Sequence, residues 1–322
     1  MKDILKEIGL AVILGFIIPG VILHGLVALG RLKEETKEQT EIVFFTQPTG
    51  EDRVISVLNR EQEVVTLDLE EYITGVVLAE MPASFEPEAL KAQSVVARTY
   101  ACRSERSGGK HDEASVCMDS SCCQSFIWPE DYLAKGGRSE AISKVSEAVN
   151  GTRGLVLTYE GELIEATYFS CSGGSTEDAV AVWGTEVPYL VATDSPGEEK
   201  ATHYEDVVSL PVHEFMQLLE LDSDQGDNLF GVITYTAGGG IDRAEIGGMT
   251  YTGTELRSML GLKSTAITFH AVGEEIQILT RGYGHRVGMS QYGADAMALS
   301  GSSYQQILAH YYRGTSLEKL PD

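Results

Sequence analysis

Hydrophobic residues are distributed unevenly along the chain, and the first cluster of them lies at the N-terminus. From Ile8 to Gly30 the sequence is almost entirely apolar and contains no Asp, Glu, Lys or Arg. A helix rises about 1.5 Å per residue, so this run can cross a hydrocarbon core of roughly 30 Å. The alternatives are a buried core helix and a cleaved signal peptide, whose apolar part is typically about 7–15 residues long. We therefore expect a transmembrane anchor over residues 1–30 and a polar juxtamembrane linker over residues 31–52.

Beyond residue 53 the pattern changes to short segments of two kinds. Alternation of apolar and polar residues predicts strands, and apolar residues at helical spacing predict helices. Strands are expected within residues 54–58, 63–69, 155–170, 230–236, 264–272 and 274–280. Helices are expected within residues 70–80, 87–103, 139–149, 211–221, 252–262 and 303–312. Because the two kinds do not alternate regularly, we expect an α+β domain over residues 53–320, with a smaller inserted subdomain over about 205–265.

The net charge of this chain restricts the classes of partner that it is expected to bind. The formal net charge is −24 at pH 7. Such a surface repels the phosphates of nucleic acids, so we expect no nucleic-acid partner. It equally argues against attachment to anionic lipid through a basic patch. A ligand of this protein is therefore expected to bind in a local groove.

Glu80 is the first candidate for chemistry, because it stands between an apolar helical segment and the pair Met81-Pro82. Apolar surroundings raise the pKa of a carboxyl group, and a raised pKa suits a general acid at neutral pH. A solvated carboxylate at a helix end is the simpler alternative. On the next predicted helix, Lys91 and Arg98 share one face and could hold a sugar or a developing negative charge. The alternative for these two residues is an ordinary solvated face.

Three of the five cysteines and one histidine lie close together in an irregular stretch. His111, Cys117, Cys122 and Cys123 could close a tetrahedral structural zinc site. A metal would fix a segment that has no obvious apolar core of its own. In an oxidising compartment the same thiols could instead form disulfides, with cysteines outside the stretch as further partners. The spacing by itself leaves both alternatives open.

Residues 282–292 combine glycines with aromatic, imidazole and amide side chains. No Rossmann unit precedes these glycines, so a nucleotide-binding loop is not expected. Glycines also let a bulky polymer approach the backbone, and sugars are bound by aromatic faces together with hydrogen-bonding groups. We therefore expect Tyr283, His285, Gln291 and Tyr292 to bind a carbohydrate.

Cys171 lies in a loop of small residues, FSCSGGST, that follows a predicted strand. A thiol there could act as a nucleophile, with His285 as its base. The sequence around Cys171 has nothing equivalent to a nucleophile elbow. A tight turn is therefore the preferred interpretation of this loop.

Three long stretches together resemble one protein family. They are EYITGVVLAEMPASFEPEALKAQSVVARTYA, ATYFSCSGGSTEDAVAVWGTEVPYLVATDSP and GYGHRVGMSQYGADAMALSGSSYQQILAHYYRGTSL. They are similar to the stage II sporulation protein D family, which includes the amidase-enhancer proteins. The resemblance covers most of the chain from about residue 53 to 318, together with the N-terminal anchor.

The resemblance implies a membrane-anchored lytic transglycosylase that cleaves peptidoglycan glycan strands during engulfment of the forespore. Sporulation members of the family prefer strands without stem peptides, and they act with an amidase and a further membrane protein. The implied location is the cell membrane at the sporulation septum, on the mother-cell side, with a single span and an extracytoplasmic domain.

The resemblance also implies roles for individual residues. Glu80 falls on the catalytic acid of the family motif AEMP, and the activity-linked lysine and arginine of the next helix fall on Lys91 and Arg98. The His and Cys residues of 111–123 match the family's zinc site, although the position of Cys122 is commonly histidine. A lone catalytic carboxylate is sufficient for a lytic transglycosylase, whereas an ordinary glycosidase uses two.

Three other functions remain open at this point. The first is a non-catalytic, glycan-binding activator of a partner amidase, which would not need an acid at position 80. The second is a hydrolase that uses Cys171 and His285. The third is a structural scaffold in a membrane complex.

Overall fold

The computed structural model describes residues 53–221 and 229–320 of the chain. The predicted anchor (1–30) and the linker (31–52) lie outside the described residues. Within the ranges described, no helix combines the length and the apolar character needed to cross a membrane. The predicted mixture of helices and strands is confirmed for the described residues.

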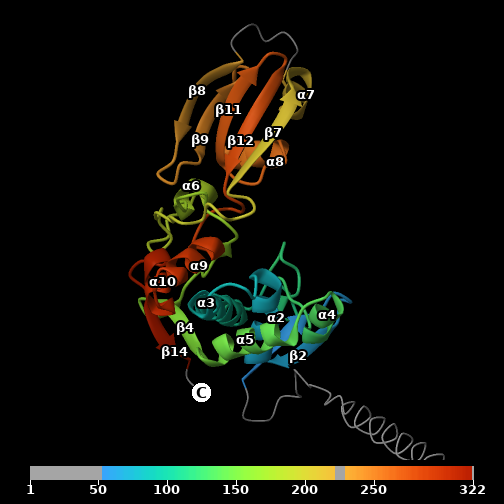
Figure 1. Cartoon of the computed structure of the whole chain (residues 1–322), viewed down its shortest axis with the longest axis vertical. Helices are drawn as coiled ribbons and strands as arrows, with labels where there is room; N and C mark the ends of the chain where they lie inside the picture. The colour runs from blue at the N-terminus through green and yellow to red at the C-terminus, as the bar shows by residue number, and fades with distance from the viewer. Residues whose placement is uncertain (1–52, 222–228, 321–322) are drawn as a thin grey trace, which may run out of the picture. The chain divides into compact units, whose positions relative to one another are not determined.

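The elements alternate irregularly along the chain (Figure 1). Up to residue 183 they are β1 (Val54–Leu58), β2 (Val64–Asp68), α2 (Leu69–Glu80), α3 (Pro87–Arg106), β3 (Val116–Cys117), α4 (Pro129–Ala134), α5 (Ser139–Asn150), β4 (Leu155–Tyr159), β5 (Glu162–Leu163), β6 (Tyr168–Phe169) and α6 (Ala179–Trp183). They continue with β7 (Glu205–Pro211), α7 (Val212–Leu218), β8 (Phe230–Tyr235), β9 (Ile241–Ile246), β10 (Met249–Tyr251), α8 (Gly253–Met259), β11 (Ala266–Val272), β12 (Glu275–Arg281), β13 (Met289–Ser290), α9 (Gln291–Leu299), α10 (Tyr304–Tyr311) and β14 (Ser316–Lys319).

Helix α3 is the central element of the part that carries the candidate site. It packs against α2, α5, α9, α10 and β4. Pro87 occupies its first turn, where the missing N–H would have had no partner inside the helix. Val95, Val96 and Ala97 are fully buried, and so is much of the rest of the helix. A helix covered on several sides in this way gives its neighbours a rigid support.

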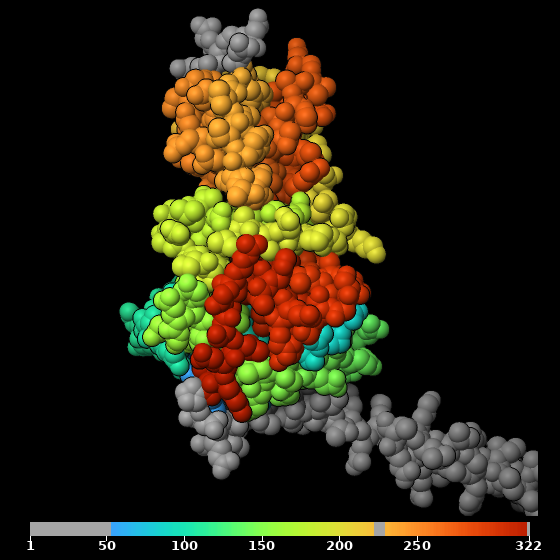
Figure 2. All heavy atoms as spheres, turned by 90° about the vertical axis from the view of Figure 1, so that its left-hand side faces the viewer, coloured from blue at the N-terminus to red at the C-terminus, as the bar shows by residue number. Residues whose placement is uncertain are grey.

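The sheets around this helical core are small, and two of them join distant parts of the chain. Strand β14 pairs antiparallel with β4, and Figure 2 shows C-terminal residues (red) beside green residues from the middle of the chain. Strand β13 pairs parallel with β6, which places Met289 opposite Tyr168. The second pairing is the one that matters for the site, because it aligns the two loops that border a cleft.

Residues 205–281, called the sandwich segment below, build a separate apolar core. One three-stranded sheet has the order β10-β9-β8 and the other has the order β11-β12-β7. Phe215 of α7, Ile246, Leu256 of α8 and Ile278 are buried between them. This unit extends beyond the expected 205–265, because β11 and β12 supply part of its core.

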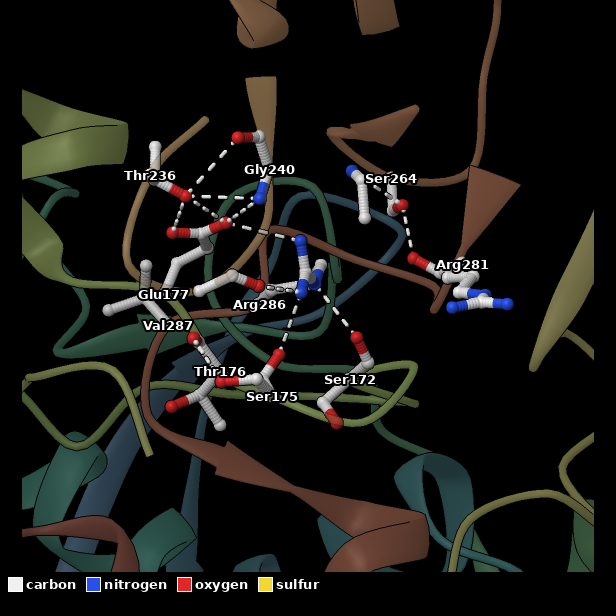
Figure 3. Close-up of polar contacts among 12 residues, drawn as sticks. Ser172, Ser175, Thr176, Glu177, Thr236, Gly240, Ser264, Arg281, Arg286 and Val287 are labelled. Atoms are coloured by element: carbon white, nitrogen blue, oxygen red, sulfur yellow. Dashed lines mark hydrogen bonds and ion pairs between the residues drawn. The ribbon is translucent and has the colours of Figure 1, made fainter. Parts of the chain in front are cut away.

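A buried ion pair joins the loop before α6 to the loop after the sandwich segment (Figure 3). Arg286 Nη1 lies 3.1 Å from Glu177 Oε1, and both side chains are at most 2% exposed. Glu177 also accepts hydrogen bonds from Thr236 Oγ1 and from the backbone N–H of Gly240, both in the sandwich segment. Arg286 Nε donates to the carbonyl oxygen of Ser172. The backbone on either side of Arg286 is therefore fixed from two directions.

Two parts of the fold differ from the sequence predictions. No helix or strand was predicted for residues 281–301, but residues 291–299 form α9. The side chain of Ser290 accepts a hydrogen bond from Gly293 N and caps this helix. Strand β7 was not predicted, because its sequence, EDVVSLP, lacks alternation and ends in proline, as suits an edge strand.

Candidate active site and metal-binding loop

Glu80 lies in a cleft of about 310 Å³. The cleft is lined by Glu80, Tyr100, Ser120, Cys123, Gln124, Ala166, Thr167, Tyr168, Phe169, Ser170, Tyr283, Gly284 and His285. The structure therefore brings four of the predicted site residues together, namely Glu80, the metal-ligand candidate Cys123, Tyr283 and His285. Among the described residues that line the cleft, Glu80 carries the only carboxylate.

The position of Glu80 follows from how α2 ends. Pro82 disfavours the helical conformation at Met81, and Met81 adopts an extended backbone with φ −125° and ψ 136°. Glu80 is therefore the last helical residue, at the end where the helix dipole disfavours negative charge. Burial raises the pKa of the Glu80 carboxyl group, while hydrogen bonds from Ser125 and Tyr168 oppose this shift. The net shift of the pKa is upward, as suits a general acid, and the carboxyl oxygen atoms still have hydrogen-bond partners.

A chain of hydrogen bonds holds the Glu80 side chain. The backbone N–H of Ser125 donates to Glu80 Oε1 at 2.6 Å. The Tyr168 hydroxyl also bonds the Glu80 carboxyl group, and it accepts a hydrogen bond from Gln124 Nε2 at 3.2 Å. Gln124 Oε1 in turn accepts from the hydroxyl of Tyr72. Burial, and then the nearby Glu80, raise the pKa of Tyr168, so this hydroxyl stays protonated and remains a donor.

Sequence analysis did not identify Tyr168, Gln124 or Ser125 as site residues. Tyr168 lies within the family-like stretch that begins ATYFS, but nothing in its spacing distinguishes it from a core tyrosine. Gln124 and Ser125 directly follow the predicted metal ligand Cys123. That adjacency is the one signal in the sequence that could have indicated them.

His285 is a neutral hydrogen-bonding residue in this cleft. Its ring packs against Phe169 and Trp183, with centroids 5.6 and 5.7 Å away. Burial, helped by the charge of Arg257, lowers the pKa of His285 to about 4. Its Nδ1 accepts the backbone N–H of Val287 at 3.1 Å, so the ring proton is on Nε2. The ring also forms a hydrogen bond with the backbone of Tyr168, which occupies its N–H, so this neutral imidazole is held in a fixed orientation at the edge of the cleft.

The four predicted metal ligands come together in space. The nitrogen and sulfur ligand atoms of His111, Cys117, Cys122 and Cys123 all lie within 4.8 Å of one another. His111 Nε2 is 3.6 Å from Cys122 Sγ and 3.7 Å from Cys123 Sγ, and the two sulfur atoms are 3.9 Å apart. Ordinary zinc bonds in a tetrahedral site place such atoms roughly 3.5–3.8 Å apart. The cluster therefore fits a tetrahedral metal ion.

The disulfide alternative does not describe this arrangement. All five cysteines belong to the described part of the chain, and all are free thiols. The separation of 3.9 Å between Cys122 Sγ and Cys123 Sγ is well above the roughly 2.0 Å of a disulfide bond. Cys102 and Cys171, the other candidate partners, are buried elsewhere.

Lys91 and Arg98 are not among the residues that line the cleft. Arg98 is fully buried, and its Nε donates to both carboxylate oxygens of Glu70 at 3.0 and 3.1 Å. Its guanidinium group also donates to backbone carbonyl groups at Val149 and Leu155. Lys91 Nζ lies 2.6 Å from a carboxylate oxygen of Glu88. A direct contact of Arg98 with a sugar would require the ion pair with Glu70 to open.

Gln291 and Tyr292 also lie outside the lining of the cleft. They are the first two residues of α9, and Gln291 is 5% exposed. The ring of Tyr292 packs edge-on against Phe85, with centroids 5.0 Å apart. Their contact with a carbohydrate therefore stays a prediction, because neither residue lines the cleft.

Cys171 has the environment of a structural thiol. It is fully buried, and its Sγ donates to Glu198 Oε2 at 3.1 Å. Burial, and then the charge of Glu198, raise the pKa of this thiol well above its usual range. The lowered pKa of His285 likewise makes its imidazole a poor base. The geometry therefore favours the tight turn over a Cys171 nucleophile.

Comparison with known proteins places these features in a family. The family model described as "Stage II sporulation protein" matches residues 58–159, which include Glu80 and all four cluster residues. The chain is 39% identical over 263 residues to "Stage II sporulation protein D" of Bacillus subtilis (strain 168). That match covers 80% of this chain and 76% of the relative.

Two further relatives extend the comparison. "Stage II sporulation protein D" of Bacillus amyloliquefaciens is 36% identical over 85% of this chain and 81% of its own length. The "Amidase enhancer" of Bacillus subtilis (strain 168) is 32% identical over 76% of this chain, but the match spans only 40% of that protein. Similarity thus extends well beyond the segment that the family model matches.

Proposed function

The chain belongs to the stage II sporulation protein D family, and from this premise we propose that it is a lytic transglycosylase acting on peptidoglycan glycan strands. The observation that carries the proposal is the single carboxylate, Glu80, among the described residues that line the cleft. A hydrolytic glycosidase needs a second carboxylate to activate water or to attack the sugar. A lytic transglycosylase does not, because its nucleophile belongs to the substrate.

Glu80 acts twice in the proposed reaction. Protonated Glu80 gives its proton to the glycosidic oxygen as the bond from that oxygen to C1 of the muramoyl residue breaks. The C6 hydroxyl of the same residue then forms a bond to C1, and the Glu80 carboxylate takes the hydroxyl proton. The products are a free 4-hydroxyl and a 1,6-anhydromuramoyl end, and no water is consumed. The raised pKa of Glu80 supports the first step.

The neighbours of Glu80 support both steps. Ser125 N–H and the Tyr168 hydroxyl keep their hydrogen bonds to the carboxyl group when it becomes a carboxylate, and so stabilise the intermediate state. His285 and Tyr283 line the same cleft, which supports a role for both in binding the sugar rings. The proposed reaction assigns no substrate contact to the four other predicted binding residues, which do not line the cleft: Lys91, Arg98, Gln291 and Tyr292.

The test of the proposed function is the identity of the product. Residues 31–322, incubated with peptide-free glycan strands, are expected to yield 1,6-anhydromuramoyl ends, detected by mass. The same reaction in H₂¹⁸O is expected to leave these ends without ¹⁸O. Reducing ends that carry ¹⁸O would show hydrolysis and overturn the proposal. Intact strands would favour the activator function instead.

The activator function is the second candidate because one relative is named an amidase enhancer. An activator would bind glycan and stimulate a partner amidase without cleaving the strand itself. We place either function in sporulation, at the septum, where the partners would be an amidase and a further membrane protein. The N-terminal segment, as a transmembrane anchor, would hold the domain on the outer face of the membrane.

We further propose that the cluster of His111, Cys117, Cys122 and Cys123 holds a structural zinc ion. The donor set of one imidazole and three thiolates suits zinc, and such an ion supplies folding stability without taking part in the chemistry. The ligand Cys123 precedes Gln124 and Ser125, which both belong to the hydrogen-bond chain around Glu80. The cluster thus supports the segment that orients Glu80.

Protein purified without chelator is expected to contain close to one zinc ion per chain by elemental analysis. Cys117→Ala is expected to lose the metal and to lower Tm by about 10 °C or more, because a structural site contributes folding energy. Cys102→Ala, a buried cysteine outside the cluster, is the matched control and should retain the metal. Metal-free wild type with unchanged Tm would contradict the zinc proposal.

A further inference from the structure

Two cations of the sandwich segment stand beside the cleft of this acidic protein. Lys263 follows α8, and its Nζ lies 5.0 Å from the centroid of the Tyr283 ring. Arg257 is in the last turn of α8. Both side chains are partly exposed, and so is Tyr283, at 38%. Their charge contrasts with the net charge of −24 for the whole chain.

Both cationic residues interact with residues that line the cleft, one through its backbone and the other through its charge. The backbone N–H of Gly284 donates to the carbonyl oxygen of Lys263 at 3.1 Å, and Gly284 is a lining residue. The charge of Arg257 acts on Tyr283 and on His285, the two side chains at this end of the cleft. Arg257 and Lys263 thus flank the aromatic edge of the cleft from the sandwich side.

Neither cation has a counter-ion within the described ranges of the chain. Arg98 and Arg286, which are almost fully buried, each pair with a glutamate. The ring of His203 packs against Tyr283, with centroids 5.0 Å apart, and its Nδ1 lies 2.9 Å from the Asp206 carboxylate, which is thus already engaged. Burial lowers the pKa of Arg257, as expected for a cation that has lost water without gaining a carboxylate.

Unpaired cations at the edge of a binding cleft indicate that the ligand supplies the negative charge. We propose, on the basis of the proposed function, that Lys263 and Arg257 bind the lactyl carboxylate of a muramoyl residue. In a peptide-bearing strand this group is an amide and is neutral. In a peptide-free strand it is a free carboxylate. The sandwich segment would therefore select strands whose stem peptides have been removed.

The test measures binding in the Glu80→Gln background, in which the ligand is not cleaved. Lys263→Gln and Arg257→Gln are each expected to weaken binding of peptide-free strands by about tenfold, the effect of losing one charge-assisted hydrogen bond. The double variant should lose more, and the dependence of its affinity on salt should become shallower. Arg243→Gln, which removes an exposed charge from β9 of the same segment, is the matched control and should bind normally.

Two further ligands identify the group that is recognised. A chitooligosaccharide has no lactyl group, and a peptide-free strand amidated at its lactyl carboxyl has no charge there. Binding of both should be weaker than that of the free strand and equal in parent and variants. Peptide-bearing strands should behave in the same way. If the substitutions weaken the binding of peptide-bearing strands to the same extent, the cations bind carboxylates of the peptide, and the inference is overturned.

The inference and the proposed function fail in different ways. Unchanged affinity of well-folded variants for peptide-free strands would overturn the inference, even if wild-type protein produced anhydro ends. Conversely, weakened and charge-specific binding would support the inference even if no cleavage were detected. Thermal unfolding of each variant verifies the fold, because a merely structural role would change Tm and leave the ligand preference unchanged.

Discussion

Replacement of Glu80 by glutamine is expected to lower the rate of glycan cleavage by about 10²–10⁴-fold, the usual contribution of a general acid–base residue. Glutamine keeps an oxygen that can accept the hydrogen bond from Ser125 N–H, so the cleft should retain its shape. The measurement is the rate of formation of 1,6-anhydromuramoyl ends. Glu147→Gln, on the exposed side of α5, is the matched control and should cleave at the wild-type rate.

The same variant should be more stable than the wild type at neutral pH. Burial raises the pKa of Glu80 in the folded state. Ionisation of this carboxyl group is therefore less favourable in the folded protein than in the unfolded chain. Below the unfolded pKa the carboxyl is protonated in both states, and no stability is lost. As pH rises through the folded pKa, the buried charge destabilises the wild type. The Tm advantage of Glu80→Gln should therefore shrink as pH falls, and a constant advantage would contradict this account.

Replacement of Arg98 by alanine is expected to lower the free energy of unfolding by about 3–5 kcal/mol, because it leaves the buried Glu70 charge without a partner. Arg98 also joins α3 to the backbone of Val149 and Leu155, so several elements lose a common link. Urea unfolding measures the loss. Arg103→Ala on the same helix is the control, because its pair with Glu165 is exposed and should contribute less than about 1 kcal/mol.

A double variant separates the structural role of Arg98 from a role in binding. Arg98→Met with Glu70→Met removes both buried charges and should recover most of the lost stability. The remaining loss comes from Gly154 N–H, which donates to Glu70 in the wild type, and from the carbonyl oxygens of Val149 and Leu155, which accept from Arg98. If Arg98 is structural, this double variant should keep the wild-type KM. A stable double variant with a strongly raised KM would instead show that Arg98 contacts the substrate.

The sequence predicted the helices of the central core well because their signals are local. Helix α2 ends before Met81-Pro82, and α3 begins at Pro87, as the proline positions indicated. The predicted helix within 139–149 is likewise present as α5. Edge strands such as β7 were missed, because a strand of mixed polarity depends on its neighbours for its hydrogen bonds.

The candidate site was predicted in part for the same reason. Glu80 and the His/Cys cluster were identifiable because residue type and near spacing carry their signal. The spacing of Lys91 and Arg98 on one helix is the same as that of two surface residues. Only the fold shows that Arg98 faces Glu70, 28 residues away. Spacing along one helix defines a face, but it does not state what covers that face.

The sequence alone therefore identified the candidate acid, the candidate metal ligands and the family, since each depends on residues that are near in the chain or on long matching stretches. Only the tertiary structure decided which groups surround the acid. Ser125 N–H reaches Glu80 across 45 positions, and Lys263 lies against Tyr283 through the sandwich segment. Hydrogen bonds and charges act over a few ångströms in space. Proximity of that kind arises when distant segments pack together, and no local pattern encodes it.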